Sequence, residues 1–458
     1  MSNTTSKRPS LDGFATNEAR SKHIASTLKR RRRKEFQFKM FGVLAVAMSI
    51  GLVAILFGTI LSKGLPAFWQ ATFVLDVTFS PDIVKIKPKP VQQPDENQAA
   101  YEKRFNDWVN RLNFINFNKL LTESVAKVLP ETKEDRRSVL QMFASSDRFV
   151  LRDMVVKDPD IVGKTVKLDL LASANVDVWL KGNIDRTLPD DRQQLSPEAR
   201  RWSDKLYEMG IIQNKFSKTL FFNADSRSSP ASAGLAGAFV GSLMMMVVVI
   251  LLAVPVGVAA AVYLEEFAPQ NRFTDFVEVN INNLAAVPSI VFGLLGASVF
   301  IIILKLPLSA PIVGGLVLSL MTLPTVIIAT RASLKAIPPS IRDGALALGA
   351  SRVQAITDHV LPLARPGILT ATIIGVAQAL GETAPLLLIG MSAFVVSVPT
   401  TPFDPSTALP VQIFLWNGNE LRNFFEARTS AAIIILLALM LTLNSLAIWL
   451  RKKFEIRW

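Results

Sequence analysis

Long apolar stretches, separated by polar and charged segments, dominate the pattern of the chain. An α-helix rises ~1.5 Å per residue, so about 20 apolar residues cross the ~30 Å hydrocarbon core of a bilayer. Six stretches reach about this length with at most one charged residue inside: 41–61, 231–264, 284–304, 306–330, 366–391 and 429–450. Soluble proteins seldom contain helices so long and so uniformly apolar. The pattern therefore predicts a mainly α-helical, polytopic membrane protein with six transmembrane helices.

The first apolar stretch is expected to be retained as a membrane anchor. A cleaved signal peptide is the alternative, but a long polar tail precedes the stretch, and LSKGLPAFWQ after it lacks an Ala-x-Ala-like cleavage site. The predicted organisation is a basic tail 1–40, a first transmembrane helix 41–63, a soluble domain 64–230, a five-helix transmembrane domain 231–450 with a loop 331–366, and a C-terminal tail 451–458.

Lysine and arginine lie beside the apolar stretches in a way that predicts their orientation. Residues 29–34 are all basic and precede the first span, residues 451–453 follow the last, and five cations occupy the loop 331–365. The opposite short loop holds Lys305 alone. Since basic residues concentrate on the cytoplasmic side, both termini and the loop 331–365 are expected there. Residues 64–230 are then expected on the opposite side of the membrane, outside the cytoplasm.

Composition narrows the function classes further. The net charge of +13 would suit nucleic-acid binding, but the topology and contact with anionic membrane lipids account for it, so no nucleic-acid partner is expected. The chain has no cysteine and two histidines, which excludes disulfides and thiolate metal sites and leaves little for any other metal centre. No catalytic or metal-ligating residue is assigned.

The segment 64–230 has no long apolar run and nearly balanced charges, which is typical of a small soluble α/β domain. Residues 85–97 read as an extended linker. Residues 101–129 are expected to be helical, with an amphipathic face formed by Trp108, Leu112, Ile115, Leu120 and Leu121. The alternation in 166–170 and 176–180 predicts two strands, and Ser196 is expected to cap a helix over 196–209. Its charged surface is either simply solvated or a docking surface for an external partner.

The loop 338–366 predicts two short helices joined by a turn. Ser340 is the expected N-cap of the first helix, and Gly349 its end, because glycine tolerates the left-handed conformation of a C-terminal cap. Ser351 and Gln354 have the spacing of a capping box for the second, which 361–362 and Pro366 should end. From the residues alone, an ordinary amphipathic connector is as good an interpretation as a docking element.

This loop resembles the coupling loop of binding-protein-dependent ABC importer permeases, in which Glu-Ala-Ala, a glycine and Ile-x-Leu-Pro recur at set offsets. The matching positions are Asp343, Gly344, Ala345, Gly349, Leu361 and Pro362. Asp343-Gly344 replaces Glu-Ala, and His359 replaces the isoleucine. The resemblance implies the type I ABC importer permease fold and a coupling helix that docks on a separate ATP-binding subunit.

No G-x-x-x-x-G-K-[ST] phosphate-binding loop occurs in the chain. We therefore expect a transporter subunit without its own ATPase site. No cofactor is expected on this chain, and ATP with Mg²⁺ would bind the partner ATPase.

The fifth span contains Glu382, an ionisable group deep in an apolar stretch. A charge there costs several kcal/mol, so it should face a bundle interior or a translocation path. Pro385 frees a backbone carbonyl at a similar depth. Together with their neighbours, these positions define a candidate translocation path: Gln378, Glu382, Thr383 and Pro385.

Residues 231–450 resemble the permeases of phosphate ABC importers, most specifically in 381–387 (GETAPLL) and 287–294 (VPSIVFGL). An arginine often lies one turn before the glutamate in that family, whereas this chain has Gln378. Positive charge for an anion would then come from Arg331, Lys305 or a partner subunit, or Glu382 is structural. The segment 64–230 resembles an N-terminal extension found in part of the family, to which no activity attaches.

The resemblance implies import of inorganic phosphate, with energy supplied by a separate ATPase. The implied partners are a second homologous permease, a dimer of ATP-binding subunits and a periplasmic phosphate-binding protein. Two alternatives stay open. The first is a permease for another small solute, such as sulfate, molybdate or an amino acid. The second is a membrane sensor or scaffold, for which we find no long cytoplasmic signalling segment.

Overall fold

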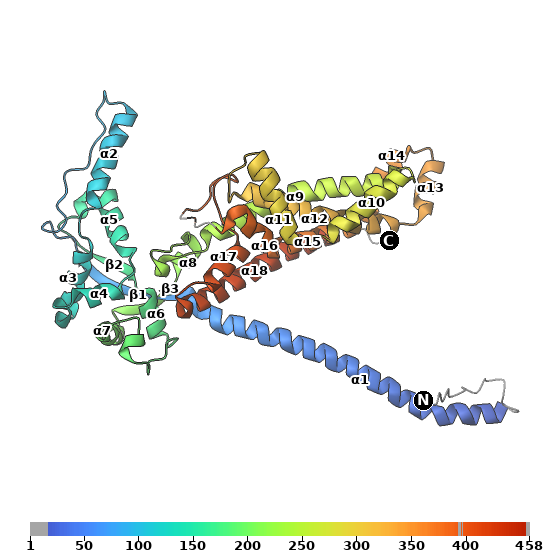
Figure 1. Ribbon diagram of the computed structural model, residues 1–458, viewed down its shortest axis with the longest axis horizontal. Helices are drawn as coiled ribbons and strands as arrows, with labels where there is room; N and C mark the ends of the chain where they lie inside the picture. The colour runs from blue at the N-terminus through green and yellow to red at the C-terminus, as the bar shows by residue number, and fades with distance from the viewer. Residues whose placement is uncertain (1–16, 393–394, 396, 455–458) are drawn as a thin grey trace. The chain divides into compact units, whose positions relative to one another are not determined.

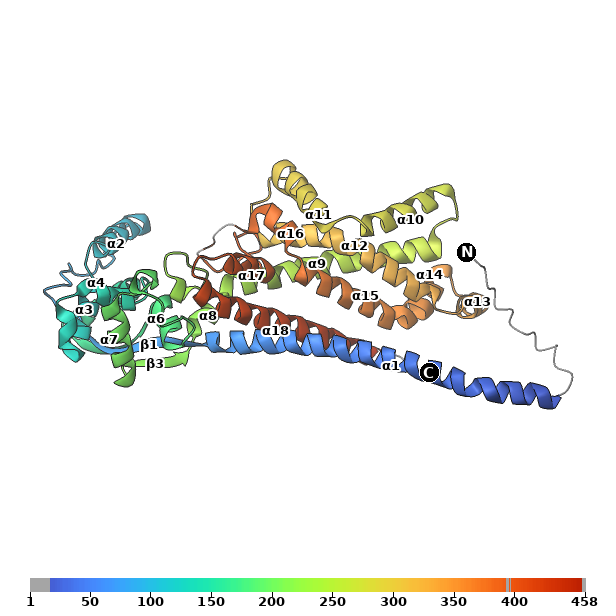
Figure 2. The same cartoon turned by 60° about the horizontal axis from the view of Figure 1, so that its bottom comes forward.

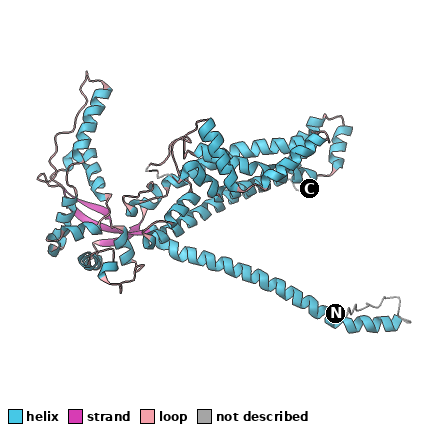
Figure 3. Cartoon of the chain, in the orientation of Figure 1, coloured by secondary structure: helices cyan, strands magenta, loops and turns pink. Residues whose placement is uncertain are grey.

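A computed structural model describes residues 17–392, 395 and 397–454. Helices predominate, and three short strands lie in the N-terminal half (Figure 1, Figure 3). The predicted fold class, a mainly helical protein with several long apolar helices and a small sheet, is confirmed. The chain divides into two compact units, residues 1–62 and 63–458, which are described separately.

The first unit consists, in its described part, of most of helix α1 (Asn17–Gly64). The helix contains the predicted anchor 41–61 without a break, within a candidate membrane span Ala25–Phe68. Its large apolar side chains from Phe36 to Phe57 are exposed, which suits a helix surrounded by lipid.

The second unit contains the remaining candidate spans. Four are single helical rods: Ala236–Phe267, Pro311–Lys335, Arg352–Gly381 and Arg422–Lys453. A further candidate is a pair of helices, α10 (Arg272–Ala285) and the segment Ser289–Ile303 that begins with α11 (Ser289–Gly296), bent by 102°. The described residues thus hold five single spans including α1, or six if the bent pair counts as one.

The stretch 284–304 is broken at Pro288, which lacks an N–H and disfavours a helical conformation at Val287. One predicted feature of these spans is wrong: 361–362 and Pro366 do not end a helix. α14 (Arg352–Gln354) continues through a π-helical turn, Ala355–Val360, into α15 (Leu361–Gly381), and both Pro362 and Pro366 lie within this continuous rod.

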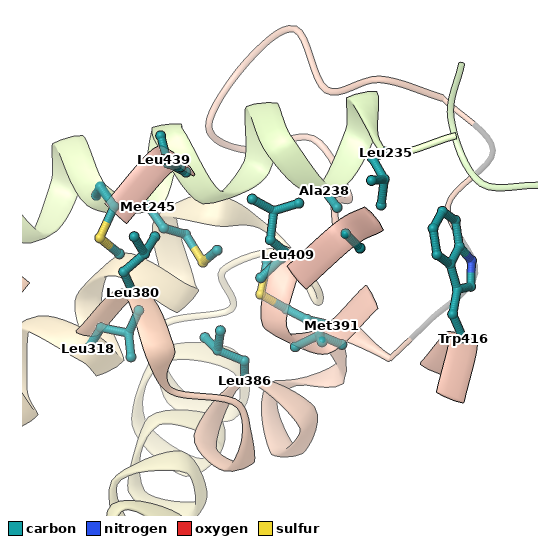
Figure 4. Packing of buried hydrophobic residues seen from close by; sticks show 14 of the residues in the cluster. Leu235, Ala238, Met245, Leu318, Leu380, Leu386, Met391, Leu409, Trp416 and Leu439 are labelled. Carbon is teal, nitrogen blue, oxygen red and sulfur yellow. The ribbon is translucent and has the colours of Figure 1, made fainter. Parts of the chain in front are cut away.

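The helical bundle, residues 230–454, packs around α9 (Ala236–Val262) and α12 (Pro311–Lys335). Figure 2 shows these two helices running beside α15 and α18 (Arg422–Phe454). Glycines permit the close approach: a Cβ on Gly315 would lie 2.5 Å from Val248 Cβ. Leucine and methionine side chains from several helices fill the core between them, including Met245, Leu318, Leu380, Leu386, Met391 and Leu409 (Figure 4).

The sheet region, residues 65–229, has a separate hydrophobic core. Its antiparallel sheet has the order β2-β1-β3, from β1 (Trp69–Thr78), β2 (Thr165–Leu171) and β3 (Ile212–Phe216). The surrounding helices are α2 (Gln98–Leu112), α3 (Asn118–Val128), α4 (Arg136–Met142), α5 (Asp147–Lys157), α6 (Ala174–Leu180), α7 (Pro197–Glu208) and α8 (Lys218–Phe222). Strand 166–170 and the helix capped by Ser196 are confirmed.

Two predictions in the sheet region are wrong. Residues 101–129 form two helices, α2 and α3, with a turn between them. Residues 176–180 belong to helix α6, not to a strand. The Ser173 side chain accepts a hydrogen bond from Val176 N and caps the helix, and 176–179 are all buried, so their alternation did not reflect two faces of a sheet.

A buried arginine joins the sheet region to the bundle. Arg428, in α18, donates to the carbonyl oxygen of Ala231 at 2.9 Å, to that of Ala233, and to the Gln70 side chain at 3.1 Å. Gln70, in β1, is itself buried and donates to Ala231 O at 2.7 Å. Since a buried guanidinium must have acceptors, this cluster holds β1 against α18.

Candidate functional site

The loop after α12 forms the predicted helix-turn-helix. α13 (Pro339–Ala347) begins two residues earlier than expected, with Pro338 at the N-cap, so Ser340 lies inside the first turn and is not a cap. Pro339 favours this start, because its fixed φ angle suits the first helical position. The predicted capping box of Ser351 and Gln354 is present, with hydrogen bonds of 2.9 and 3.2 Å.

Gly349 ends α13 as predicted. Its φ angle is +91°, in the left-handed region. Gly349 N donates to Leu346 O at 3.0 Å, and Ala350 N donates to Ala345 O at 3.1 Å. These two bonds form a Schellman motif, which requires a left-handed residue at this position. The turn between α13 and α14 therefore has one defined shape.

The loop presents a small, partly apolar edge. Asp343 and Gly344 are exposed, and Leu348 is 91% exposed. No other heavy atom lies within 4 Å of where a Cβ would stand on Gly344 or Gly349. Exposed leucine beside bare backbone is typical of a surface that another protein approaches closely.

The six predicted coupling residues do not all share this edge. Asp343, Gly344 and Gly349 lie on it, whereas Ala345 is buried beneath it. Leu361 and Pro362 are half-buried in the first turn of α15. A small apolar cluster nearby supports the loop, made of Leu334, Ile337, Val360 and Ala364.

Acidic residues at the end of α9 bind arginines of the loop and of α12. Glu266 accepts hydrogen bonds from Arg342 Nε and Nη2 at 3.0 and 2.6 Å. These bonds raise the pKa of the Arg342 guanidinium above its usual value. Sequence reasoning missed this contact, although two adjacent glutamates at the end of an apolar span were a visible signal.

Arg331 is not a free cation for a translocation path. Its Nε lies 3.2 Å from Glu265 Oε2, and its Nη2 lies 2.6 Å from Glu278 Oε1. Lys335 adds a longer contact of 3.7 Å to Glu265. Two carboxylates therefore already neutralise Arg331, and the expectation that it might supply positive charge to an anion is not supported. Lys305 is exposed in the turn before α12.

The candidate path residues lie where the fifth span breaks. α15 ends at Gly381, and Glu382 adopts an extended conformation (φ −75°, ψ 130°) before α16 (Ala384–Leu386). Gln378 is exposed, Glu382 and Thr383 are half-buried, and Pro385 is buried. Within the described part of the chain, the side chains of Gln378 and Glu382 have no hydrogen-bond or ion-pair partner.

The two broken spans meet at their breaks. A Cβ on Gly293, in α11, would lie 2.7 Å from Pro385 Cα and 2.9 Å from Pro385 O. The segments 287–294 and 381–387, which carry the family resemblance, are therefore packed backbone to backbone. Discontinuous helices whose ends meet inside a bundle are typical of solute sites in transporters. Among the described residues, no group of His, Asp and Glu could hold a metal ion.

Comparison with known proteins matches both parts of the chain. Residues 253–457 match the family described as binding-protein-dependent transport system inner membrane component, and residues 25–190 match a domain of unknown function. The chain is 31% identical to the phosphate transport system permease protein PstA of Yersinia pestis, over 52% of this chain and 79% of that protein. For PstA of Haemophilus influenzae the values are 31%, 50% and 81%.

A probable ABC transporter permease of Bacillus subtilis, YqgI, is 28% identical over 53% of this chain and 84% of its own length. Among solved structures, a chain of the inward-facing methionine ABC transporter MetNI is 18% identical, with a TM-score of 0.38, over 48% of this chain and 96% of that chain. On the strength of the sequence matches, the chain belongs to the binding-protein-dependent transport system inner membrane components and is a PstA-type permease.

Proposed function

We propose that this chain is a transmembrane permease subunit that imports inorganic phosphate, driven by a separate ATPase. The observation that carries the proposal is the likeness to PstA proteins over about four fifths of their length, at 31% identity. The family match over residues 253–457 includes the two segments that pack together, 287–294 and 381–387. The fold supplies what such a subunit needs: several apolar spans, a polar break within them and an exposed loop for an external motor.

The exposed edge of the coupling loop is the proposed docking site for the ATPase. Asp343, Gly344 and Gly349 would enter a groove of that subunit, where the missing side chain of Gly349 allows close backbone approach. Leu348 would be buried there on assembly. The loop then lies in the cytoplasm, and closure of the ATPase dimer moves it as a rigid element.

The break at Glu382 is the proposed place where phosphate passes. Gln378 and Glu382 lie one turn apart, and neither has a polar partner in the described chain. Glutamine donates hydrogen bonds to an anion, whereas a bare carboxylate repels a phosphate dianion. Glu382 therefore accepts a hydrogen bond from protonated phosphate or is neutralised by a cation of a second permease subunit. Thr383 and Pro385 shape the break.

The proposed assembly places a homologous permease beside this chain, two ATP-binding subunits on the cytoplasmic face and a phosphate-binding protein on the periplasmic face. The sheet region would stand in the periplasm, with both termini in the cytoplasm. The absence of cysteine makes this topology directly testable. A cysteine placed at Asn183 should react with an impermeant maleimide in intact cells, whereas one at Ser351 should react only after the membrane is opened.

Uptake of radiolabelled phosphate at micromolar supply tests the substrate. Deletion of the chain should abolish high-affinity phosphate uptake, and the wild-type chain should restore it. Sulfate, molybdate and amino-acid uptake serve as controls. Unchanged phosphate uptake together with lost uptake of one of these solutes would reassign the permease to that solute. If the deletion leaves the uptake of all these solutes unchanged, a transport function is contradicted and a sensor or scaffold is favoured.

A further inference from the structure

Both arms of the helix-turn-helix bind one residue, Glu266. It lies in the π-helical turn Tyr263–Phe267 that ends α9, and it is only 7% exposed. Its carboxylate contacts Arg342 of α13, and its backbone carbonyl accepts a hydrogen bond from Arg352 Nη2 of α14. Arg352 also lies over the Phe267 ring, 5.6 Å from the centroid. The turn at the end of α9 is thus held by both arms.

Arg342 is fully engaged in this contact. Its Nε and Nη2 bind the two carboxylate oxygens of Glu266, which is the fork geometry that fixes direction as well as distance. The remaining donors reach the C-terminal end of α12: Nη1 to Ile337 O at 2.9 Å and Nη2 to Leu334 O at 3.0 Å. One side chain therefore ties α13 to both α9 and α12.

The apolar contacts of α13 are too few to set its orientation. Only Ala345 is buried among its nine residues. The supporting cluster Leu334, Ile337, Val360 and Ala364 comes from the flanking segments, and α13 adds one half-buried side chain to it, Ile341. Hydrophobic contact is non-directional, so one buried alanine and one half-buried isoleucine leave the orientation of this short helix weakly defined. A forked, largely buried ion pair does not permit sliding.

We propose that Glu266 is a positioning residue that locks the coupling loop to the end of α9, so that movement of the loop is passed to the spans. We call the ion pair between Glu266 and Arg342 the clamp. The inference rests on the proposed function, since it assigns this clamp a role in the coupling of ATP hydrolysis to phosphate uptake. Without this contact, α13 moves when the ATPase subunits close, but it does not carry α9 with it. ATP is then hydrolysed with less solute moved.

The decisive variants are Glu266→Gln, which keeps the shape but loses the charge and one strong acceptor, and Arg342→Gln, which removes the fork. Glu278→Gln is the matched control: it also removes a carboxylate from an arginine pair at this end of the bundle, but its partner Arg331 lies in α12 and forms its ion pairs with Glu265 and Glu278, not with α13 or α14. Each variant is reconstituted in the complete complex in liposomes. ATP hydrolysed per phosphate imported is measured, as is the quantity of assembled complex.

We expect the ATP consumed per phosphate to rise about tenfold in both clamp variants, which corresponds to about 1.4 kcal/mol, and to stay at the wild-type value in Glu278→Gln. If Glu266→Gln and Arg342→Gln hydrolyse as much ATP per phosphate as the wild type does, the role of the clamp is overturned. The proposal that the chain imports phosphate would be unaffected by that result. A wild-type complex that imports no phosphate would instead refute the proposed function.

Hydrogen exchange of the α13 amides in the intact permease tests the clamp without reference to any substrate. Exchange should quicken in Glu266→Gln and Arg342→Gln, but not in Glu278→Gln. Equal exchange in all three variants and the wild type would overturn the proposal even if the variants differ in activity. Should either clamp variant fail to assemble, Arg342→Lys gives the second measurement: it keeps one donor, and exchange between wild-type and Arg342→Gln values is expected. Wild-type exchange in Arg342→Lys would overturn the fork.

Discussion

Substitution of Gly349 by alanine should uncouple the transporter without unfolding the chain. A Cβ at this position meets no atom within 4 Å, so the cost is entirely in the backbone. The φ angle of +91° lies in the region where an L-residue is disfavoured by about 1–2 kcal/mol. This cost lowers the population of the native turn between α13 and α14 by a factor of about 5–30. The same cost is small beside the total stability of a folded protein.

The matched control is Gly344→Ala, in the same loop. Its Cβ also meets nothing within 4 Å, but Gly344 lies inside α13 with ordinary helical geometry. Alanine should stabilise the helix there by about 0.5–1 kcal/mol. Alanine is also the usual residue at this position in the coupling loops of binding-protein-dependent ABC importer permeases. This variant should therefore fold and couple normally.

The assay is phosphate uptake and ATP hydrolysis by the reconstituted complex, with membrane insertion checked in parallel. Gly349→Ala should insert normally and hydrolyse ATP with reduced uptake. Gly349→Asn should fall between it and the wild type, because asparagine tolerates the left-handed region. If Gly349→Ala couples as the wild type does, or if Gly344→Ala is equally impaired, the argument from the φ angle is wrong.

Three further predictions concern packing and titration. Gly293→Val should lower the thermal unfolding temperature of the purified chain, since its Cβ would meet the Pro385 backbone at 2.7 Å and overpacking costs about 1–3 kcal/mol; an unchanged temperature would refute the close contact. Arg428→Met should leave the Ala233 carbonyl without its donor, at about 1–3 kcal/mol, while Ala231 O keeps the bond from Gln70 and the Gln70 side-chain oxygen keeps those from Ser217 and Thr219. Limited proteolysis should then cut between the sheet region and the bundle, and resistance equal to the wild type would contradict this. Burial raises the pKa of Asp147 to about 8 from 3.8, so the folded chain holds a proton that the unfolded chain has lost. Stability should therefore fall between about pH 4 and pH 8 and stay level above. Asp147→Asn should remove this slope in hydrogen exchange of the α5 amides, and parallel slopes would refute the assignment.

The apolar spans were predictable because each is a property of one continuous segment. Uniform hydrophobicity places α9 and α12 within about five residues of the expected ranges, whereas α15 ends at Gly381 and not at 391, and α18 begins at Arg422 and not at 429. The sequence did not show that the third span bends by 102°. Pro288 marks the break, but other prolines, such as Pro255 and Pro324, lie inside unbroken helices. Whether a proline kinks or splits a span depends on the neighbours that satisfy the freed carbonyl.

The sheet region was less predictable because its sheet joins distant segments. β1 pairs with strands that begin about ninety and about a hundred and forty residues later, and its near-continuous burial hides the alternation that identifies a strand. Apolar and polar residues alternate in 176–180, but the stretch is helical and is capped by Ser173. Because 176–179 are all buried, the alternation does not separate a buried face from an exposed one. Local periodicity is informative only where one face meets water.

The coupling loop shows the same contrast within one site. The turn at Gly349 and the capping box at Ser351 depend on residues a few positions apart, and both were predicted correctly. The bond between Glu266 and Arg342 joins residues 76 positions apart, so the two adjacent glutamates could mark one partner of a contact but could not identify the other. The element that docks is local in sequence, whereas the element that holds it in place is not.

The path residues point to a site that one chain does not complete. An unpaired carboxylate at Glu382 is costly in an apolar surrounding, and Gln378 brings no compensating charge. Arg331, the nearest candidate within the spans, is already bound to two carboxylates. Arg428 is bound to carbonyls at the junction with the sheet region. Of the cations that the sequence offered for this path, Lys305 and a cation of a second permease subunit are left. In the proposed assembly, a cation of the second permease would stand opposite Gln378, because only one side of a shared path has to carry the charge.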